Sequence, residues 1–138
     1  MKPAQLLIQA LREPETVLGF QKPQLEALIV SSERSRLTAT LGYRLEDAGV
    51  MARLPERVRH HFDAAMVNAR FRNRLIRWEM NRVARALRDL DVEVVVIKGG
   101  AYLLLDLPLA RGRLLADLDI LVRRSDLPVL ERQLLAAG

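Results

Sequence analysis

Two aspartates near the end of the sequence are spaced so that they could share one metal ion. Asp117 and Asp119 open an apolar run, Asp117 to Val122, that has the length of a β-strand. Because alternate residues of a strand point to the same face, both carboxylates are expected on one side. Mg²⁺ usually binds one or two carboxylates and completes its coordination with water and substrate phosphates. We therefore expect Asp117 and Asp119 to bind Mg²⁺, with Mn²⁺ as the alternative ion.

A pair of glycines upstream supplies a second feature. The β-branched run Val92 to Ile97 predicts a strand, which ends at Lys98-Gly99-Gly100 before a short helix at Ala101 to Leu105. Glycine lets the backbone approach a ligand closely, and the N–H groups at a helix start can bind phosphate oxygens. A glycine turn and paired aspartates on successive strands are the parts that a phosphoryl-transfer site needs. The two aspartates have other interpretations. They could belong to a solvated strand edge, or form the Asp-x-Asp of a sugar-nucleotide glycosyltransferase.

The elements that would position these residues follow a mostly helical region. Residues 1–90 are predicted to form a short helix from Pro3 to Leu11, a second from Pro23 to Asp47 that Ser31, Ser32 and Ser35 weaken, and a long third helix from Pro55 to Leu90. The apolar stripe of the third helix contains Asn73, for which we expect a structural hydrogen bond to a neighbouring loop. A last helix is expected at Leu127 to Ala137. The predicted fold class is α+β.

The amino-acid composition excludes several classes of protein. The chain has 138 residues and no cysteine, which excludes disulfides and cysteine chemistry. No stretch of about 18 apolar residues predicts a membrane span, and we expect a cytoplasmic protein without a membrane partner. Residues 1–90 hold 16 of the 22 Lys and Arg against 10 of the 17 Asp and Glu, so the formal charge of +5 is concentrated there. Arginines close to one line, from Arg70 to Arg88, give a second hypothesis, a non-catalytic module that binds nucleic acid or an acidic partner.

Residues 92 to 124 resemble a known family signature. The segment IKGGAYLLLDLPLARGRLLADLDILV is similar to the signature of the polymerase-beta nucleotidyltransferase superfamily, in which a strand ending in Gly-Gly precedes a strand with Asp-x-Asp. Within it, the Lys98-Gly99 turn, Arg113 four residues before Asp117, and the run Asp117 to Val122 resemble a bacterial nucleotidyltransferase family.

The resemblance implies a Mg²⁺-dependent transfer of a nucleoside monophosphate from a nucleoside triphosphate to an unknown hydroxyl acceptor. Asp117 and Asp119 would be catalytic and bind the metal, and the nucleotide would be bound by Lys98, Gly99, Gly100 and Arg113. The superfamily's third carboxylate has no counterpart after Asp119. We therefore expect a helical region at 1–90 and a partial nucleotidyltransferase core at 91–138. A carboxyl-terminal remainder of the protein or a second copy of the chain would complete this core, and without either the chain would be inactive.

Overall fold

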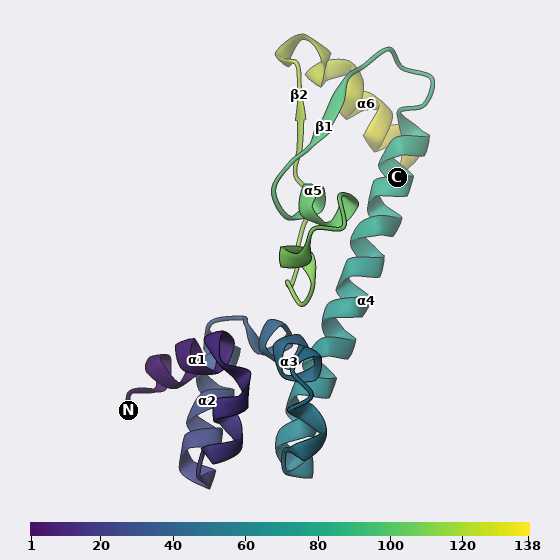
Figure 1. Cartoon of the computed structure of the whole chain (residues 1–138). Coiled ribbons are helices and arrows are strands. Elements are labelled where there is room, and N and C mark those ends of the chain that lie inside the picture. Colours follow the sequence, from purple (N-terminus) through teal and green to yellow (C-terminus); the bar gives the residue numbers. More distant parts are fainter. The chain divides into compact units, whose positions relative to one another are not determined.

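The computed structural model describes residues 1–138 and is mostly helical, with one small antiparallel sheet (Figure 1). The predicted α+β class is thereby confirmed. In chain order the elements are α1 (Pro3–Arg12), η1 (Pro14–Gly19), α2 (Lys22–Arg34), α3 (Thr38–Asp47), η2 (Met51–Arg53), α4 (Glu56–Ala86), β1 (Val94–Val96), α5 (Lys98–Leu104), η3 (Pro108–Ala110), β2 (Ile120–Val122), η4 (Arg124–Asp126) and α6 (Leu127–Ala137). None of the helices combines the length and the apolar character that crossing a bilayer requires.

The chain forms two compact units. The first comprises residues 1–71 together with the short segment 111–114, and the second comprises residues 72–110 and 115–138. Helix α4 therefore contributes its first part to one unit and its remainder to the other.

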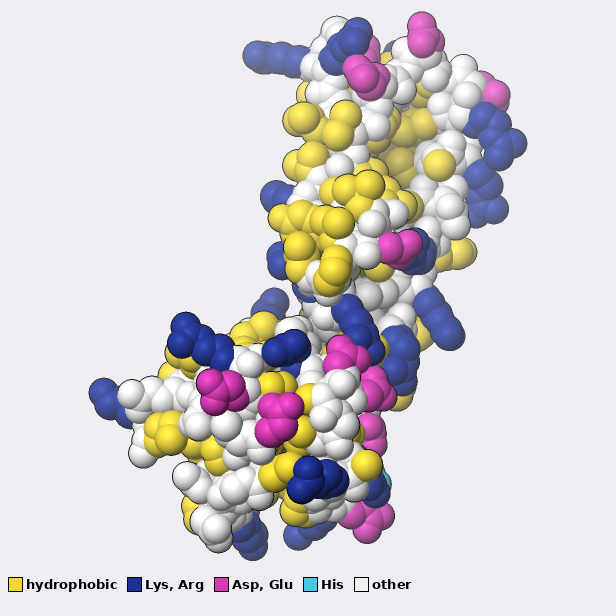
Figure 2. Space-filling view, in the orientation of Figure 1, with side chains coloured by type: hydrophobic (Ala, Val, Ile, Leu, Met, Phe, Trp, Pro, Cys, Tyr) yellow, Lys and Arg dark blue, Asp and Glu magenta, His cyan; other side chains and the backbone are white.

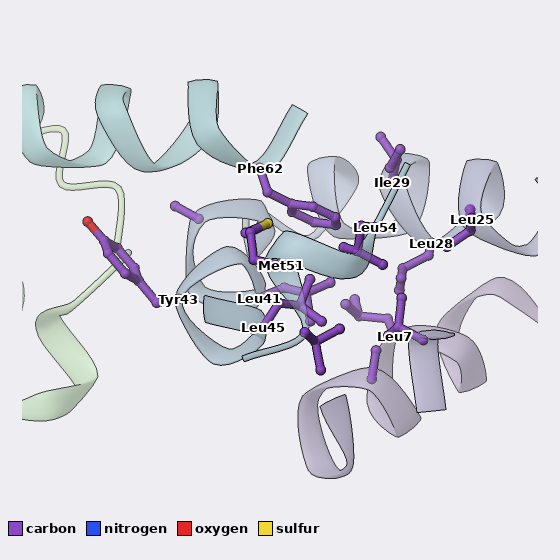
Figure 3. Close-up of a cluster of buried hydrophobic side chains, with 14 of the residues drawn as sticks. Leu7, Leu25, Leu28, Ile29, Leu41, Tyr43, Leu45, Met51, Leu54 and Phe62 are labelled. Carbon is purple, nitrogen blue, oxygen red and sulfur yellow. The ribbon is translucent and has the colours of Figure 1, made fainter. Parts of the chain in front are cut away.

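The first unit is held together by an apolar core of seventeen buried residues. Figure 3 shows Phe62, from the first part of α4, directed toward Leu54 and Met51, with leucines of α1, α2 and α3 filling the space beside them. Phe62, Leu28, Leu41 and Leu45 are fully buried. Burial of a side chain of this size stabilises a fold by about 1.5–3 kcal/mol, so this cluster accounts for the compactness of the helical unit.

The single helix expected from Pro23 to Asp47 is wrong, because α2 and α3 are separate helices. The chain turns at Arg36, whose φ of 57° is left-handed, and the Leu37 N–H donates to the Ser32 carbonyl at 2.8 Å. The buried Ser32 hydroxyl lies 2.8 Å from the Ile29 carbonyl and 3.1 Å from the Thr38 hydroxyl. A left-handed residue with this hydrogen bond is a usual helix ending. Ser32, one of the serines that weakened the helix pattern, stabilises this ending through its hydroxyl group.

In the second unit, α4 from residue 72, α5 and the segment before β2 supply a small core of Ile76, Met80, Leu103 and Leu115, with Leu118 packed against it. Strands β1 and β2 pair in the register Val94↔Val122, Val95↔Leu121 and Val96↔Ile120. Both strands are shorter than expected: β1 starts at Val94 rather than Val92, and β2 starts at Ile120 rather than Asp117. Helix α4 ends at Ala86, short of Leu90, and is followed by a turn.

Candidate functional site

The end of β1 and the segment before β2 are joined by a backbone hydrogen bond. The Ile97 N–H donates to the Asp119 carbonyl at 3.1 Å, which extends the antiparallel ladder one step beyond the two strands. The aspartates therefore do not lie within β2 as expected, but in the extended segment that leads into it. This hydrogen bond places the backbone of Asp119 next to Lys98, the first residue of α5. Helix α5 begins three residues before the expected Ala101, so Gly99 and Gly100 belong to its first turn, called the Lys98 turn below, and not to a loop ahead of it.

Lys98 turns toward Asp119 from a strained backbone. Its φ of 55° is left-handed, a conformation that costs a residue with a side chain about 1–2 kcal/mol. The Lys98 Nζ lies 3.3 Å from Asp119 Oδ2, and the two side chains are 68% and 35% exposed. Strained residues of this kind gather at functional sites, where the surrounding structure maintains them. At this exposure the ion pair contributes no more than about 1 kcal/mol, so another cation can replace the ammonium group.

Gly100 brings the same two segments into direct contact. A Cβ at Gly100 would lie 2.9 Å from Leu118 Cδ1 and 2.9 Å from Val96 Cγ1, closer than Cβ atoms approach in proteins. Leu118 stands between the two aspartates in the sequence, so the absence of a side chain at Gly100 allows the Asp117–Asp119 segment to pack on the turn. Gly99 is buried beside it. The glycine pair therefore has a packing role at Gly100 that the sequence interpretation did not include.

Arg77 makes hydrogen bonds at the carboxyl-terminal end of α5. Its guanidinium donates to the Leu103 carbonyl at 2.9 Å and to Asp106 Oδ1 at 2.7 Å. A cation at the last carbonyls of a helix satisfies acceptors that have no partner within the helix and is favoured by the helix dipole. Arg77 was expected on the charged line from Arg70 to Arg88. In the structure it anchors the short helix whose first residues are Lys98, Gly99 and Gly100.

Two further expected residues take no part in this contact within the second unit. Asp117 is exposed, and Arg113 belongs to the segment 111–114 of the first unit. The structure contains no group of three or more His, Asp or Glu side chains that could hold a metal ion. The hydrogen bond expected for Asn73 is absent. Its side-chain Oδ1 is buried and accepts no hydrogen bond.

The arrangement fits a divalent cation that keeps several non-protein ligands. Carboxylates are the donors that Mg²⁺ prefers, and an ion held by one or two of them retains positions for water and phosphate oxygens. A positive group already pairs with one of the Asp119 oxygens. The donor set and this pairing are both consistent with a cation-binding position at Asp117 and Asp119.

Comparisons with known proteins identify one match. The model of a family described as an uncharacterised nucleotidyltransferase matches residues 21–138, which is most of the chain. No curated protein and no solved structure matches the sequence.

Proposed function

The chain belongs to this family of uncharacterised nucleotidyltransferases, and on that premise we propose that it transfers a nucleoside monophosphate from a nucleoside triphosphate to a hydroxyl group. The acceptor oxygen would attack the α-phosphorus, forming a new phosphoester bond. The bond to the bridging oxygen would break, pyrophosphate would leave, and the hydroxyl proton would pass to solvent. Residues 91–138 would carry this chemistry, as in the polymerase-beta superfamily that their motif resembles.

The observation that carries the proposal is the contact between the Lys98 turn and the Asp117–Asp119 segment. The Lys98–Asp119 ion pair and the packing of Leu118 on Gly100 bring together two segments that the sequence pattern had linked only by their order. A phosphate-binding turn and a metal-binding segment must be adjacent, because the metal would neutralise charge on the phosphates that the turn would receive.

Each residue has a distinct role in the proposed site. Asp117 and Asp119 would hold Mg²⁺, which supplies charge neutralisation at the phosphates and orients them for in-line displacement. Gly99 and Gly100 would receive the β- and γ-phosphates through the backbone. Lys98 would exchange its carboxylate partner for a phosphate oxygen, which the exposure of most of its side chain supports. Arg113, which the resemblance also assigns to the nucleotide, belongs to the first unit and is given no role in this site.

Calorimetric titration with ATP, GTP, CTP and UTP, with and without Mg²⁺, tests the proposal. We expect binding of at least one nucleotide that requires Mg²⁺ and is lost in the double variant Asp117→Asn/Asp119→Asn. The matched control is Asp63→Asn/Asp89→Asn, which removes two exposed carboxylates elsewhere and should bind like the unaltered chain. Circular dichroism establishes that each variant is folded. Nucleotide binding that the Asp117/Asp119 variant retains, or no binding by the folded chain, would contradict the proposed site.

A further inference from the structure

The second unit exposes one side of α4 that the proposed nucleotide site does not use. Residues four, three and four apart fall on one face of a helix, and Arg74, Trp78, Asn81 and Arg85 of α4 follow this spacing. Arg88 lies in the turn directly after α4 and lines a hollow together with Trp78, Asn81 and Arg85. The core residues Ile76 and Met80 of the same helix lie on the opposite face. Figure 2 shows Lys and Arg side chains along this part of the molecule. This set is called the outer α4 face below.

Trp78 is the feature that a merely solvated helix surface does not explain. It is the only tryptophan of the chain, and 52% of it is exposed. The guanidinium carbon of Arg82 lies 4.8 Å from the centre of its ring, which restrains the indole against the helix. Exposing a large aromatic surface to water is unfavourable, and a flat ring held on a charged surface is the usual platform on which nucleic-acid bases stack.

The charges around Trp78 are not neutralised. Arg74, Arg85 and Arg88 pair with no carboxylate, whereas Arg77 and Arg82 have acidic partners at Asp106 and Glu79. Trp78, Asn81, Ala84, Arg85 and Arg88 line an open hollow, in which no acidic side chain takes part. An occupant must therefore bring negative charge and a flat ring.

We propose that the outer α4 face binds single-stranded nucleic acid, with bases stacked on Trp78 and phosphates at Arg74, Arg85 and Arg88. A single strand supplies unpaired bases and a regular series of phosphates, and aromatic rings within a positive groove bind it with little dependence on sequence. The Asn81 amide, which can both donate and accept hydrogen bonds, lies within the same stripe. This binding requires no divalent cation and does not depend on the proposed nucleotidyl transfer.

The single tryptophan makes the test direct. We expect a short oligothymidylate, added at low salt in the presence of EDTA, to quench the fluorescence of the unaltered chain, because the stacked base would contact Trp78 itself. The affinity should fall as salt rises, since bound phosphates release their counterions. ATP under the same conditions should quench less than the oligonucleotide, because a single nucleotide cannot place a series of phosphates along Arg74, Arg85 and Arg88. Failure of the oligonucleotide to bind the folded chain would overturn the proposal.

Variants separate stacking from charge, with a fluorescein-labelled oligothymidylate as the probe. Trp78→Ala should weaken binding by at least about fivefold and Trp78→Phe by less, because stacking contributes about 1–3 kcal/mol per base. Arg85→Glu/Arg88→Glu should lower the slope of log affinity against log salt by about 1.4, since each phosphate contact to a single strand contributes about 0.7.

The control variant is Arg12→Glu/Arg53→Glu, which makes the same charge change at exposed arginines of the first unit. We expect it to retain most of the affinity and the unaltered salt slope. Equal losses in both double variants, together with no effect of Trp78→Ala and equal competition by poly-glutamate, would identify a general anion surface and overturn the proposal for nucleic acid.

Discussion

The Lys98–Asp119 pair has opposite consequences for the metal and for the nucleotide. The ammonium group pairs with Asp119 Oδ2 at 3.3 Å and would thus compete with the proposed metal ion for that oxygen. If Asp119 held the metal, the same ammonium group would be free to pair with a phosphate. The lysine should therefore oppose metal binding in the free protein and support nucleotide binding in the complex.

Replacing Lys98 by methionine should reveal both effects. We expect Lys98→Met to raise the affinity for Mn²⁺ without nucleotide by up to about fivefold, which corresponds to about 1 kcal/mol for an exposed ion pair. The affinity for the Mg²⁺–nucleotide complex should fall. Mn²⁺ binding is measured by electron paramagnetic resonance and nucleotide binding by calorimetry. Lys22→Met, which breaks the exposed pair with Glu26, is the control, and a loss of both affinities in Lys98→Met would disprove competition.

The contact between Lys98 and Asp119 could be predicted from the sequence only in part. The strand, turn and Asp-x-Asp pattern indicated that both residues belong to one site. The left-handed backbone at Lys98, from which the side chain reaches Asp119, has no sequence signal, because a lysine rarely adopts it. Arg77 likewise resembled the other arginines of α4, since its partners Leu103 and Asp106 are remote in the sequence.

At the scale of elements, the site depends on how closely α5 approaches the segment before β2. Gly100 sets this separation, since Leu118 and Val96 occupy the space that a Cβ would need. Met80 of α4 also lies within 3.5 Å of that position, so the constraint involves both the strand and the helix behind the turn. The three contacts are all side-chain atoms, so a Cβ at Gly100 requires the Leu118 and Val96 side chains to shift.

Gly100→Ala should destabilise the protein by about 1–3 kcal/mol, the usual cost of overpacking a core, and should weaken Mg²⁺-dependent nucleotide binding because Leu118 moves with its flanking aspartates. Gly19→Ala is the matched control, because nothing lies within 4 Å of a Cβ at Gly19. It should leave the stability unchanged or raise it by about 0.4–1 kcal/mol. Urea unfolding measures both. Equal stabilities of the two variants would show that the turn and the Asp117–Asp119 segment are not tightly packed.

The helices show why the boundaries of an element are harder to predict than its type. Apolar residues at helical spacing indicated one helix from Pro23 to Asp47, and the structure is helical on both sides of the break. The break itself depends on a contact between Ser32 and Thr38 that forms only once the chain has turned. The strands were recognised, but each has only three residues, which pair from Val94↔Val122 to Val96↔Ile120. Beyond them a single backbone hydrogen bond, from Ile97 to Asp119, continues the ladder.

At the scale of the whole molecule, the two units differ in how much core they possess. Seventeen buried residues form the core of the first unit, and four form that of the second. The sheet of the second unit contains two short strands, and Val95 and Leu121, which are opposite each other, are 47% and 58% exposed. Regions with few buried apolar contacts open more readily than the rest of a protein.

Hydrogen exchange should therefore divide the chain into two classes of stability. We expect the amides of β1, β2 and α5 to exchange faster than those of α2 and α3. The Mg²⁺–nucleotide complex should slow exchange in the second unit and leave the first nearly unchanged, because a ligand stabilises the state that binds it. Mass spectrometry of peptic peptides resolves the two regions. Equal protection of α2 and β1 in the free protein would contradict the difference expected from the cores.

The first unit is discontinuous in sequence, because residues 111–114 belong to it. Arg111 pairs with Asp47 at 2.7 Å and lies over the Tyr43 ring, and Gly112, with φ of 81°, leaves no room for a Cβ beside Thr40. During translation, the helices of residues 1–71 leave the ribosome before residues 111–114 are synthesised, so their contacts with this segment form later. The Lys98 turn is synthesised in the interval. The amino-terminal helices are thus expected to reach their final packing only after the residues of the candidate site have emerged.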